Sequence, residues 1–221
     1  MTHEPNKSLL SEIDPDLAAR FIPNRRNLFR EAAVRLGVLA TAPLVLAAAS
    51  REAFAKGMPK QIVDTLNFAL TLEYIENAFY STGLKRGVVP ARYLPVFRII
   101  AKHERQHVAF LQGALGSAAV GKPQADFTAG GKYPDVFSNF KTFLTLSQTF
   151  EDLGVAAYKG QAGNLMSNDG ILTAALQIHS VEARHAAEVR RIGGKKGWTG
   201  AFDQPKSKAQ VLAAAGPFLK G

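Results

Sequence analysis

Hydrophobic residues recur every three or four positions over four long stretches of the chain, which is the spacing of amphipathic helices. The four stretches cover approximately residues 60–81, 91–115, 136–160 and 171–192. Breaks rich in Gly and Pro separate them; the first is expected to begin at Gly83, and the break from 116 to 134 is the longest. Two helix pairs with short turns, joined by one long connection, predict an all-α fold, namely a four-helix bundle with a single crossover. A short helix at 208–215 is expected to pack outside the bundle.

The first 55 residues differ in character from the rest. A polar stretch leads to an arginine pair at positions 25 and 26, followed by an apolar run over 36–49 and small residues at 53 and 55. These are the parts of a secretory signal, and the arginine pair favours the twin-arginine route. The apolar run is shorter than the roughly 20 residues that cross a bilayer as a helix. We therefore expect a leader and twin-arginine signal peptide at 1–55 and the folded domain at 56–221.

This leader predicts a periplasmic or otherwise extracytoplasmic protein. If the signal is not cleaved, the apolar run stays as an N-terminal anchor helix before the bundle. An ordinary amphipathic helix is the alternative for this segment. The run is apolar on all sides and contains Pro43, which argues against that alternative.

The composition excludes several classes of site. The chain has no cysteine, which rules out disulfides, iron–sulfur clusters, zinc held by thiolates and thiol catalysis. Its hydrophobic content of 47% is too high for a disordered protein. The absence of cysteine leaves the redox compartment open, because a large core needs no disulfides.

Four polar residues on the apolar faces of the first two helices recur in the last two, always 78 positions later. Glu73 and Tyr80 correspond to Glu151 and Tyr158, respectively. In the same way, Glu104 and His107 correspond to Glu182 and His185. The chain thus holds two copies of Glu-x6-Tyr, each followed by Glu-x-x-His. This is an internal repeat of chemistry as well as of helices.

Such a repeat suits a pair of metal ions. Residues three apart lie on one face of a helix, so the Glu and the His of each Glu-x-x-His can reach the same ion. Four carboxylates and two imidazoles are a mixed oxygen and nitrogen set that divalent iron or manganese accepts. Four buried carboxylates without cations would repel one another and take up protons. Two divalent ions cancel their charge.

The paired motifs resemble the ferritin-like superfamily of di-iron carboxylate proteins, in which two helices give a Glu and two give Glu-x-x-His. The segment 66–74, Leu-Asn-Phe-Ala-Leu-Thr-Leu-Glu-Tyr, is similar to exported ferritin-like domain proteins that include plant desiccation-related proteins. The resemblance covers about residues 58–215. It implies that two iron ions, or manganese ions in their place, are held by Glu73, Glu104, His107, Glu151, Glu182 and His185.

The same resemblance implies roles and substrates. Tyr80 and Tyr158 correspond to tyrosines beside the metals, either redox-active or only structural. The expected chemistry is oxidation of Fe(II) by O2, or reaction with peroxide, as protection against stress. Two other functions stay open: a dimanganese catalase with the same ligands, and a structural or accessory subunit of a membrane complex. Assembly into an oligomer is compatible with the sequence.

Other residues compete for the same site. His103 to His107 reads HExxH, the zinc protease signature, but the second copy has Val181 in place of His103. The protease interpretation explains one helix, whereas the di-metal interpretation explains four. Glu76 competes with Glu73 as the ligand from the first helix, yet its counterpart is Gly154, so Glu73 is preferred. We expect His103 and His179 to be hydrogen-bonded rather than ligands.

The net charge of +9 and the pI near 9.9 indicate anionic partners. The basic residues form no long run interleaved with aromatic residues, so nucleic acid is not indicated. Residues 56–221 keep 20 Lys and Arg against 12 Asp and Glu, and four of these acids belong to the predicted metal site. The exterior is therefore strongly basic, and we expect it to meet an anionic membrane surface, a cell-wall polymer or an acidic protein.

Overall fold

The computed structural model describes residues 57–220, and within this range the regular elements are all helices. The predicted signal segment at 1–55 lies outside the described residues. The four long helices are α4 (Lys60–Arg86), α5 (Leu94–Leu115), α6 (Phe140–Gln161) and α7 (Asp169–Ile192). Four single turns of 3-10 helix accompany them: η1 (Ala91–Tyr93), η2 (Gly116–Ala118), η3 (Ala162–Leu165) and η4 (Gly216–Phe218). The all-α prediction is confirmed for this part of the chain.

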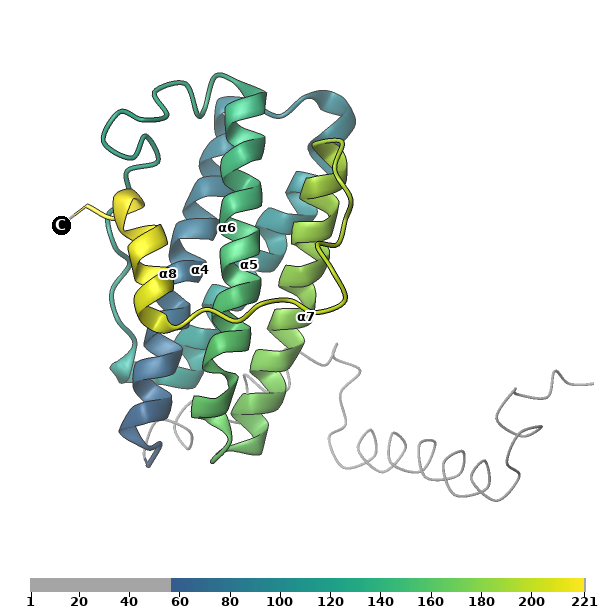
Figure 1. Cartoon of the computed structure of the whole chain (residues 1–221). Helices are drawn as coiled ribbons and strands as arrows, with labels where there is room; N and C mark the ends of the chain where they lie inside the picture. The colour runs from purple at the N-terminus through teal and green to yellow at the C-terminus, as the bar shows by residue number, and fades with distance from the viewer. Residues whose placement is uncertain (1–56, 221) are drawn as a thin grey trace, which may run out of the picture. The chain divides into compact units, whose positions relative to one another are not determined.

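The long helices pack as two antiparallel pairs, α4 with α5 and α6 with α7. The connection between the pairs, residues 119–139, runs along the bundle from the end of α5 to the opposite end (Figure 1). As a result α5 and α6 run in the same direction. This is the single long crossover that the lengths of the sequence breaks predicted.

The first helix is longer than predicted, because Gly83 does not end it. Gly83 lies inside α4, which continues to Arg86 and ends at Gly87 with a left-handed φ of 69°. A Cβ atom on Gly83 would lie only 2.3 Å from Cε2 of Phe143 in α6. This glycine therefore lets two helices approach closely, and the expected break was wrong.

The starts of α6 and α7 are set by asparagine caps. The Asn139 side chain accepts a hydrogen bond from the Lys141 amide, and that of Asn168 accepts one from the Ile171 amide. Each cap satisfies an amide that the first turn of a helix leaves unpaired. For this reason α6 begins later than the hydrophobic pattern predicted, and α7 begins slightly earlier.

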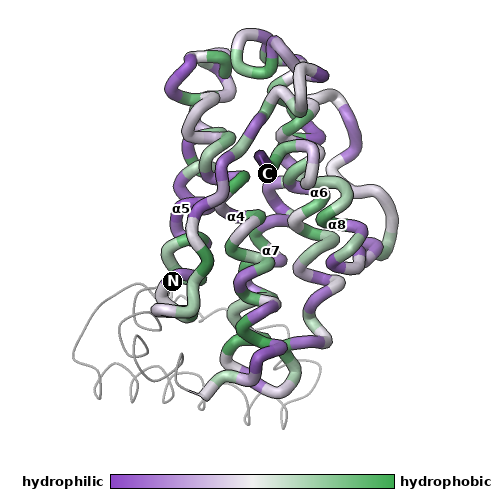
Figure 2. Tube along the Cα trace, turned by 90° about the vertical axis from the view of Figure 1, so that its left-hand side faces the viewer, coloured by the Kyte–Doolittle hydropathy of each residue, from purple (hydrophilic) through white to green (hydrophobic). Residues whose placement is uncertain are grey.

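The core has an aromatic end and an aliphatic end. At the aromatic end, Phe79 stacks on Phe143 with ring centroids 4.6 Å apart, and Tyr80 and Phe97 pack against the same ring. The other end is filled by aliphatic side chains such as Leu70 of α4. Hydrophobic and hydrophilic stretches alternate along the helices, as amphipathic elements require (Figure 2). The acidic residues described below lie between these two apolar ends of the core.

The predicted tail helix is present as α8 (Lys208–Ala215) and packs on the outside of the bundle. Val211 and Ala215 of α8 share an apolar cluster with side chains of both α4 and α6. The preceding segment is held by a hydrogen bond from the Lys206 amide to the Ala156 carbonyl, 3.0 Å long. Among residues 57–220, each helix is too short or too polar to span a membrane.

Candidate metal centre

The six residues predicted as ligands come together in the middle of the bundle. They are Glu73 of α4, Glu104 and His107 of α5, Glu151 of α6, and Glu182 and His185 of α7. The four carboxylates are fully buried, and the two histidines are 7% and 5% exposed. Carboxylates are almost never buried without a partner, so this grouping calls for a charge that balances it.

The cluster divides into two overlapping groups of four. One group contains Glu73 and His107, the other contains Glu151 and His185, and both contain Glu104 and Glu182. Within each group, one ligand atom from every residue lies within 4.8 Å of the others. Two neighbouring cation positions that share two carboxylates fit this geometry.

Contacts in the two groups match closely. His107 Nδ1 lies 3.2 Å from Glu73 Oε2 and 3.2 Å from Glu182 Oε1. The equivalent atom of His185 lies 3.3 Å from Glu151 Oε2 and 3.0 Å from Glu104 Oε1. Each histidine therefore faces one carboxylate of its own half and one of the other half, so the sequence repeat is also a repeat in space.

The two tyrosines cross between the halves. Tyr80 donates a hydrogen bond to Glu151 Oε1 over 2.5 Å, and Tyr158 donates one to Glu73 Oε1 over 2.6 Å. Burial and the facing carboxylate raise the pKa of both phenols well above the ordinary value, so both remain protonated donors. In both cases the tyrosine binds Oε1 of the carboxylate. Oε2 of Glu73 then faces His107, and Oε2 of Glu151 faces His185.

Burial and mutual repulsion set the protonation of the carboxylates. Burial, and then the charge of Glu73, raise the pKa of Glu104 to about 7. Burial and the charge of Glu104 raise the pKa of Glu182 well above its ordinary value. At Glu73 burial acts in the same direction and is the largest single effect, but the charge of His107 and the hydrogen bonds to Glu73 together outweigh it and lower the pKa. The cluster therefore holds protons when no other cation balances it.

The histidines respond in the opposite sense. Burial lowers the pKa of His185, but the facing carboxylates of Glu104 and Glu151 outweigh burial and raise it to about 10. Burial lowers the pKa of His107 as well, but the charge of Glu73 and the other facing carboxylates together outweigh burial and raise this pKa above its ordinary value. A metal ion that binds here must displace these protons, since only the neutral imidazole is a ligand.

Several buried oxygens are suited to a metal ion. In the described part of the chain, neither oxygen of Glu104 or of Glu182 accepts a hydrogen bond, although histidine nitrogens lie at ion-pair distance. Glu151 Oε2 is in the same situation. Buried acceptors without donors are costly, and two divalent cations would satisfy all of them at once. The residues present thus fit a di-metal centre.

The remaining histidines lie at the edge of the site. His103 is half-buried, and its Nδ1 lies 2.9 Å from His185 Nε2, with the two rings stacked. His103 contacts a histidine of the cluster but belongs to neither group of four. The HExxH interpretation requires His103 as a metal ligand, so the structure does not match it. His179 is also half-buried and belongs to neither group; its Nε2 makes no hydrogen bond within the described residues, contrary to expectation.

Sequence reasoning set aside one acidic residue that the structure places beside the cluster. Glu76 is only 4% exposed, although it was rejected as a ligand because Gly154 stands at the equivalent position. Its burial could have been predicted, since it follows Glu73 by one helical turn and therefore shares the same face of α4. Comparison of positions 78 apart identifies only residues that both halves contain, so Glu76, which has Gly154 as its counterpart, was not selected.

Comparison with known proteins agrees with this geometry. The model of a family described as the ferritin-like domain matches residues 61–195. The six clustered residues and both tyrosines lie within that range. A search of curated proteins finds no significant match to this chain.

Proposed function

Because the chain belongs to the ferritin-like domain family, we propose that its buried cluster binds two iron ions and oxidises Fe(II) with O2 or peroxide. The observation that supports this proposal most directly is the pair of overlapping groups, in which Glu104 and Glu182 take part twice. Unpaired oxygens on both of these carboxylates supply the room and the charge for two cations. The cellular role would be protection against oxidative stress.

The residues have distinct tasks in this proposal. Glu104 and Glu182, which belong to both groups, would help to hold both ions, whereas Glu73 with His107, and Glu151 with His185, would each hold one of them. Bound iron supplies reversible electron transfer and open coordination positions for O2 or peroxide. Tyr80 and Tyr158 fix the orientation of Glu151 and Glu73, so that one oxygen of each points into the cluster.

The apolar ends of the bundle exclude water from this chemistry. Phe79, Phe97 and Phe143 close one end, and the aliphatic cluster around Leu70 closes the other. A dry surrounding strengthens the attraction between carboxylates and cations and keeps reactive oxygen species away from bulk solvent. This shielding suits a redox centre better than a site that exchanges a large substrate.

Metal content and reactivity of the purified protein test the proposal. After anaerobic loading with Fe(II), we expect two iron ions per chain and Fe(II) oxidation when O2 or peroxide is added. The Glu104→Ala/Glu182→Ala variant should lose both ions, whereas Glu188→Ala, a change on α7 outside the cluster, should keep them.

Other outcomes would redirect or overturn the proposal. Two manganese ions with rapid release of O2 from peroxide would identify a dimanganese catalase instead. Failure of the wild-type protein to bind any metal would contradict both redox functions and favour the structural or accessory role.

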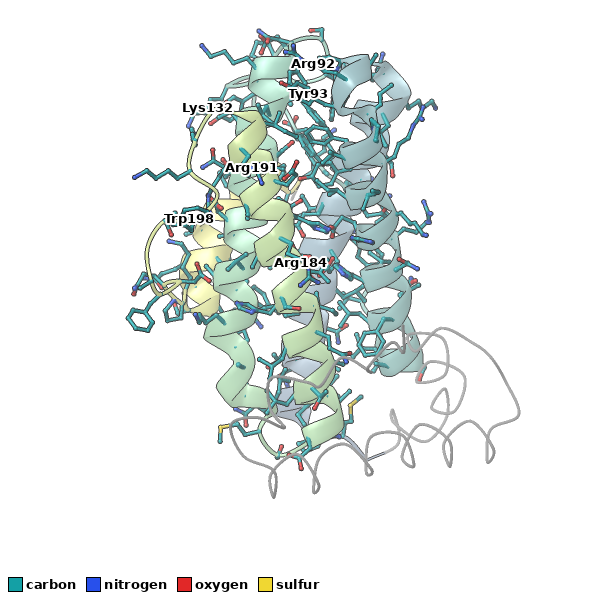
Figure 3. The ribbon with its side chains drawn as sticks, turned by 90° about the vertical axis from the view of Figure 1, so that its right-hand side faces the viewer. Arg92, Tyr93, Lys132, Arg184, Arg191 and Trp198 are labelled. Atoms are coloured by element: carbon teal, nitrogen blue, oxygen red, sulfur yellow. The ribbon has the colours of Figure 1, made fainter. Side chains whose placement is uncertain are left out.

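We also propose that the protein is exported and that its basic exterior meets an anionic membrane surface. The segment from α7 to α8 carries Trp198, 73% exposed, and Phe202, 82% exposed. Figure 3 shows Trp198 on the outside of the bundle. Lysines at 195, 196 and 206 surround these rings in the sequence. Exposed aromatic residues among lysines suit the interface of an anionic bilayer.

Trp198 is the only tryptophan in the chain and is therefore a built-in reporter of binding. Vesicles containing phosphatidylserine should shift its emission to shorter wavelength, and phosphatidylcholine vesicles should not. The shift should weaken at high salt and in a Phe202→Ser variant. For export, replacing Arg25 and Arg26 by lysine should retain the protein in the cytoplasm. Unchanged emission with both vesicles, or unchanged export, would contradict these proposals.

A further inference from the structure

The internal repeat fails at one buried position beside the cluster. Glu76 lies one turn after Glu73 on α4 and is 4% exposed. The residue 78 positions later is Gly154 in α6, which is also buried. The α4 side of the centre therefore carries a carboxylate that the α6 side lacks.

Gly154 makes room for this additional carboxylate. A Cβ atom at position 154 would lie 2.9 Å from Glu182 Oε2 and 3.3 Å from Glu76 Oε1. Both carboxyl groups thus converge on the space that any other residue would fill with its side chain. The missing side chain at Gly154 thus leaves the space beside which the Glu76 carboxyl group lies.

The six-residue set leaves Glu76 unexplained. Glu182 Oε1 faces His107, but Glu182 Oε2 points toward Gly154 and accepts no hydrogen bond from the described residues. A second carboxyl group beside this oxygen adds repulsion where both side chains are buried. A cation near both groups is the simplest means of offsetting that cost.

A small cavity borders Glu76 and Gly154, lined otherwise by apolar side chains of α4 and α6 and bounded by Ala215 of α8. In the conformation described, Glu76 lies outside both groups of four. On this side, therefore, the Glu76 side chain borders a cavity and is not fully enclosed by packed neighbours.

We propose that Glu76 is a seventh metal ligand, admitted beside Glu182 by Gly154, and that it makes the two metal positions unequal. The inference rests on the proposed di-metal function. Two divalent ions carry four positive charges, which the four repeated carboxylates balance. A fifth carboxylate matches the additional charge present when one of the two ions is trivalent, so Glu76 stabilises the oxidised centre.

The Glu76→Gln variant tests the inference, because it keeps the size of the side chain and removes its charge. Mn(II) titration by calorimetry should show two binding steps in the wild-type protein. In the variant, one step should weaken by at least tenfold while the stoichiometry stays at two. The equilibrium between the diferrous and mixed-valence states should shift at least tenfold toward the diferrous state, which is 59 mV for a one-electron couple.

Two further variants separate a ligand from a merely structural residue. Gly154→Ala keeps every carboxylate but crowds Glu76 and Glu182, so it should weaken metal binding as well. Glu188→Gln, outside the cluster, should leave affinity and potential unchanged. The metal-free Glu76→Gln protein should unfold at the same temperature as the wild type or higher, since the amide is buried uncharged without having to take up a proton. A structural role for Glu76 predicts a lower temperature.

The possible failures are distinguishable. If the wild-type protein binds no metal, the di-metal function fails and this inference fails with it. If the wild type binds two ions and Glu76→Gln leaves both affinities and the potential unchanged, only the seventh ligand is refuted. A weaker step accompanied by a higher potential supports it.

Discussion

The helix pair α4–α5 and the helix pair α6–α7 carry the same candidate ligands but surround them differently. Each pair contributes one Glu, one Glu-x-x-His and one tyrosine, with matching contacts. Only α4–α5 adds the buried Glu76, and only it carries His103 against a histidine of the other half. The repeated residues define a symmetric centre, and the unrepeated ones give it two different sides.

Among changes confined to one half, the largest effect should come from removing the carboxylate that belongs to one group of four only. Glu73→Ala should lose the ion next to His107, and Glu151→Ala should lose the ion next to His185, because each is found in one group of four. Each variant should therefore bind one metal ion per chain instead of two, as measured by elemental analysis after dialysis. Retention of two ions in either variant would contradict the division into two positions.

A change of pH should reveal the protons that metal ions replace. In the metal-free protein the pKa of Glu104 is raised from 4.5 to about 7 and that of His185 from 6.5 to about 10. Groups with a raised pKa hold protons more tightly in the folded state. Their contribution to the free energy of unfolding is complete at a pH below the pKa of the unfolded state, and it is lost as the pH rises through the pKa of the folded state. The lowered pKa of Glu73 acts in the opposite sense at acid pH.

The unfolding temperature of the metal-free protein should accordingly fall as the pH is raised from about 5 to about 10. The metal-loaded protein should change much less over this range, since its ligands have already lost their protons. Calorimetric scans with and without a chelator provide the comparison. Parallel curves would show that the ligands do not titrate in the metal-free state.

The crossed tyrosines should have similar effects in both halves. Tyr80→Phe and Tyr158→Phe each remove a hydrogen bond to a buried carboxylate, which should cost about 1–3 kcal/mol in the free energy of unfolding. Urea titration of the metal-free variants measures this cost. Loss of Fe(II) oxidation in a variant that still binds two ions would assign a redox role to that tyrosine, and full activity in both would leave them structural.

The smallest effect should come from the histidine at the edge of the site. His103→Val introduces the residue that the other half has at the equivalent position, Val181. Without the contact to Nε2, the ring of His185 is less well oriented, so one ion should bind about tenfold more weakly. The affinity of the other ion is the internal control. Equal weakening of both ions would show that His103 acts on the whole centre.

The clustering of the six glutamate and histidine residues could be predicted from the sequence, because repetition and helical spacing together restrict which residues share a face. The partners of Tyr80 and Tyr158 could not, since each hydrogen bond crosses to the other half and depends on how the pairs pack. Gly83 was misread for a different reason. A glycine suits both the end of a helix and a close approach between helices, and only the position of Phe143 distinguishes them.

The crossed hydrogen bonds have a consequence for how such a site can form. Neither helix pair contains a complete group of four candidate ligands, and each depends on the other to orient one of its own glutamates. Two separate copies of one pair would have to associate as a homodimer, with occupancy that depends on concentration. The connection between α5 and α6 replaces that dependence with a fixed effective concentration, and it also allows the two copies to differ. A true homodimer could not place glutamate on one side and glycine on the other.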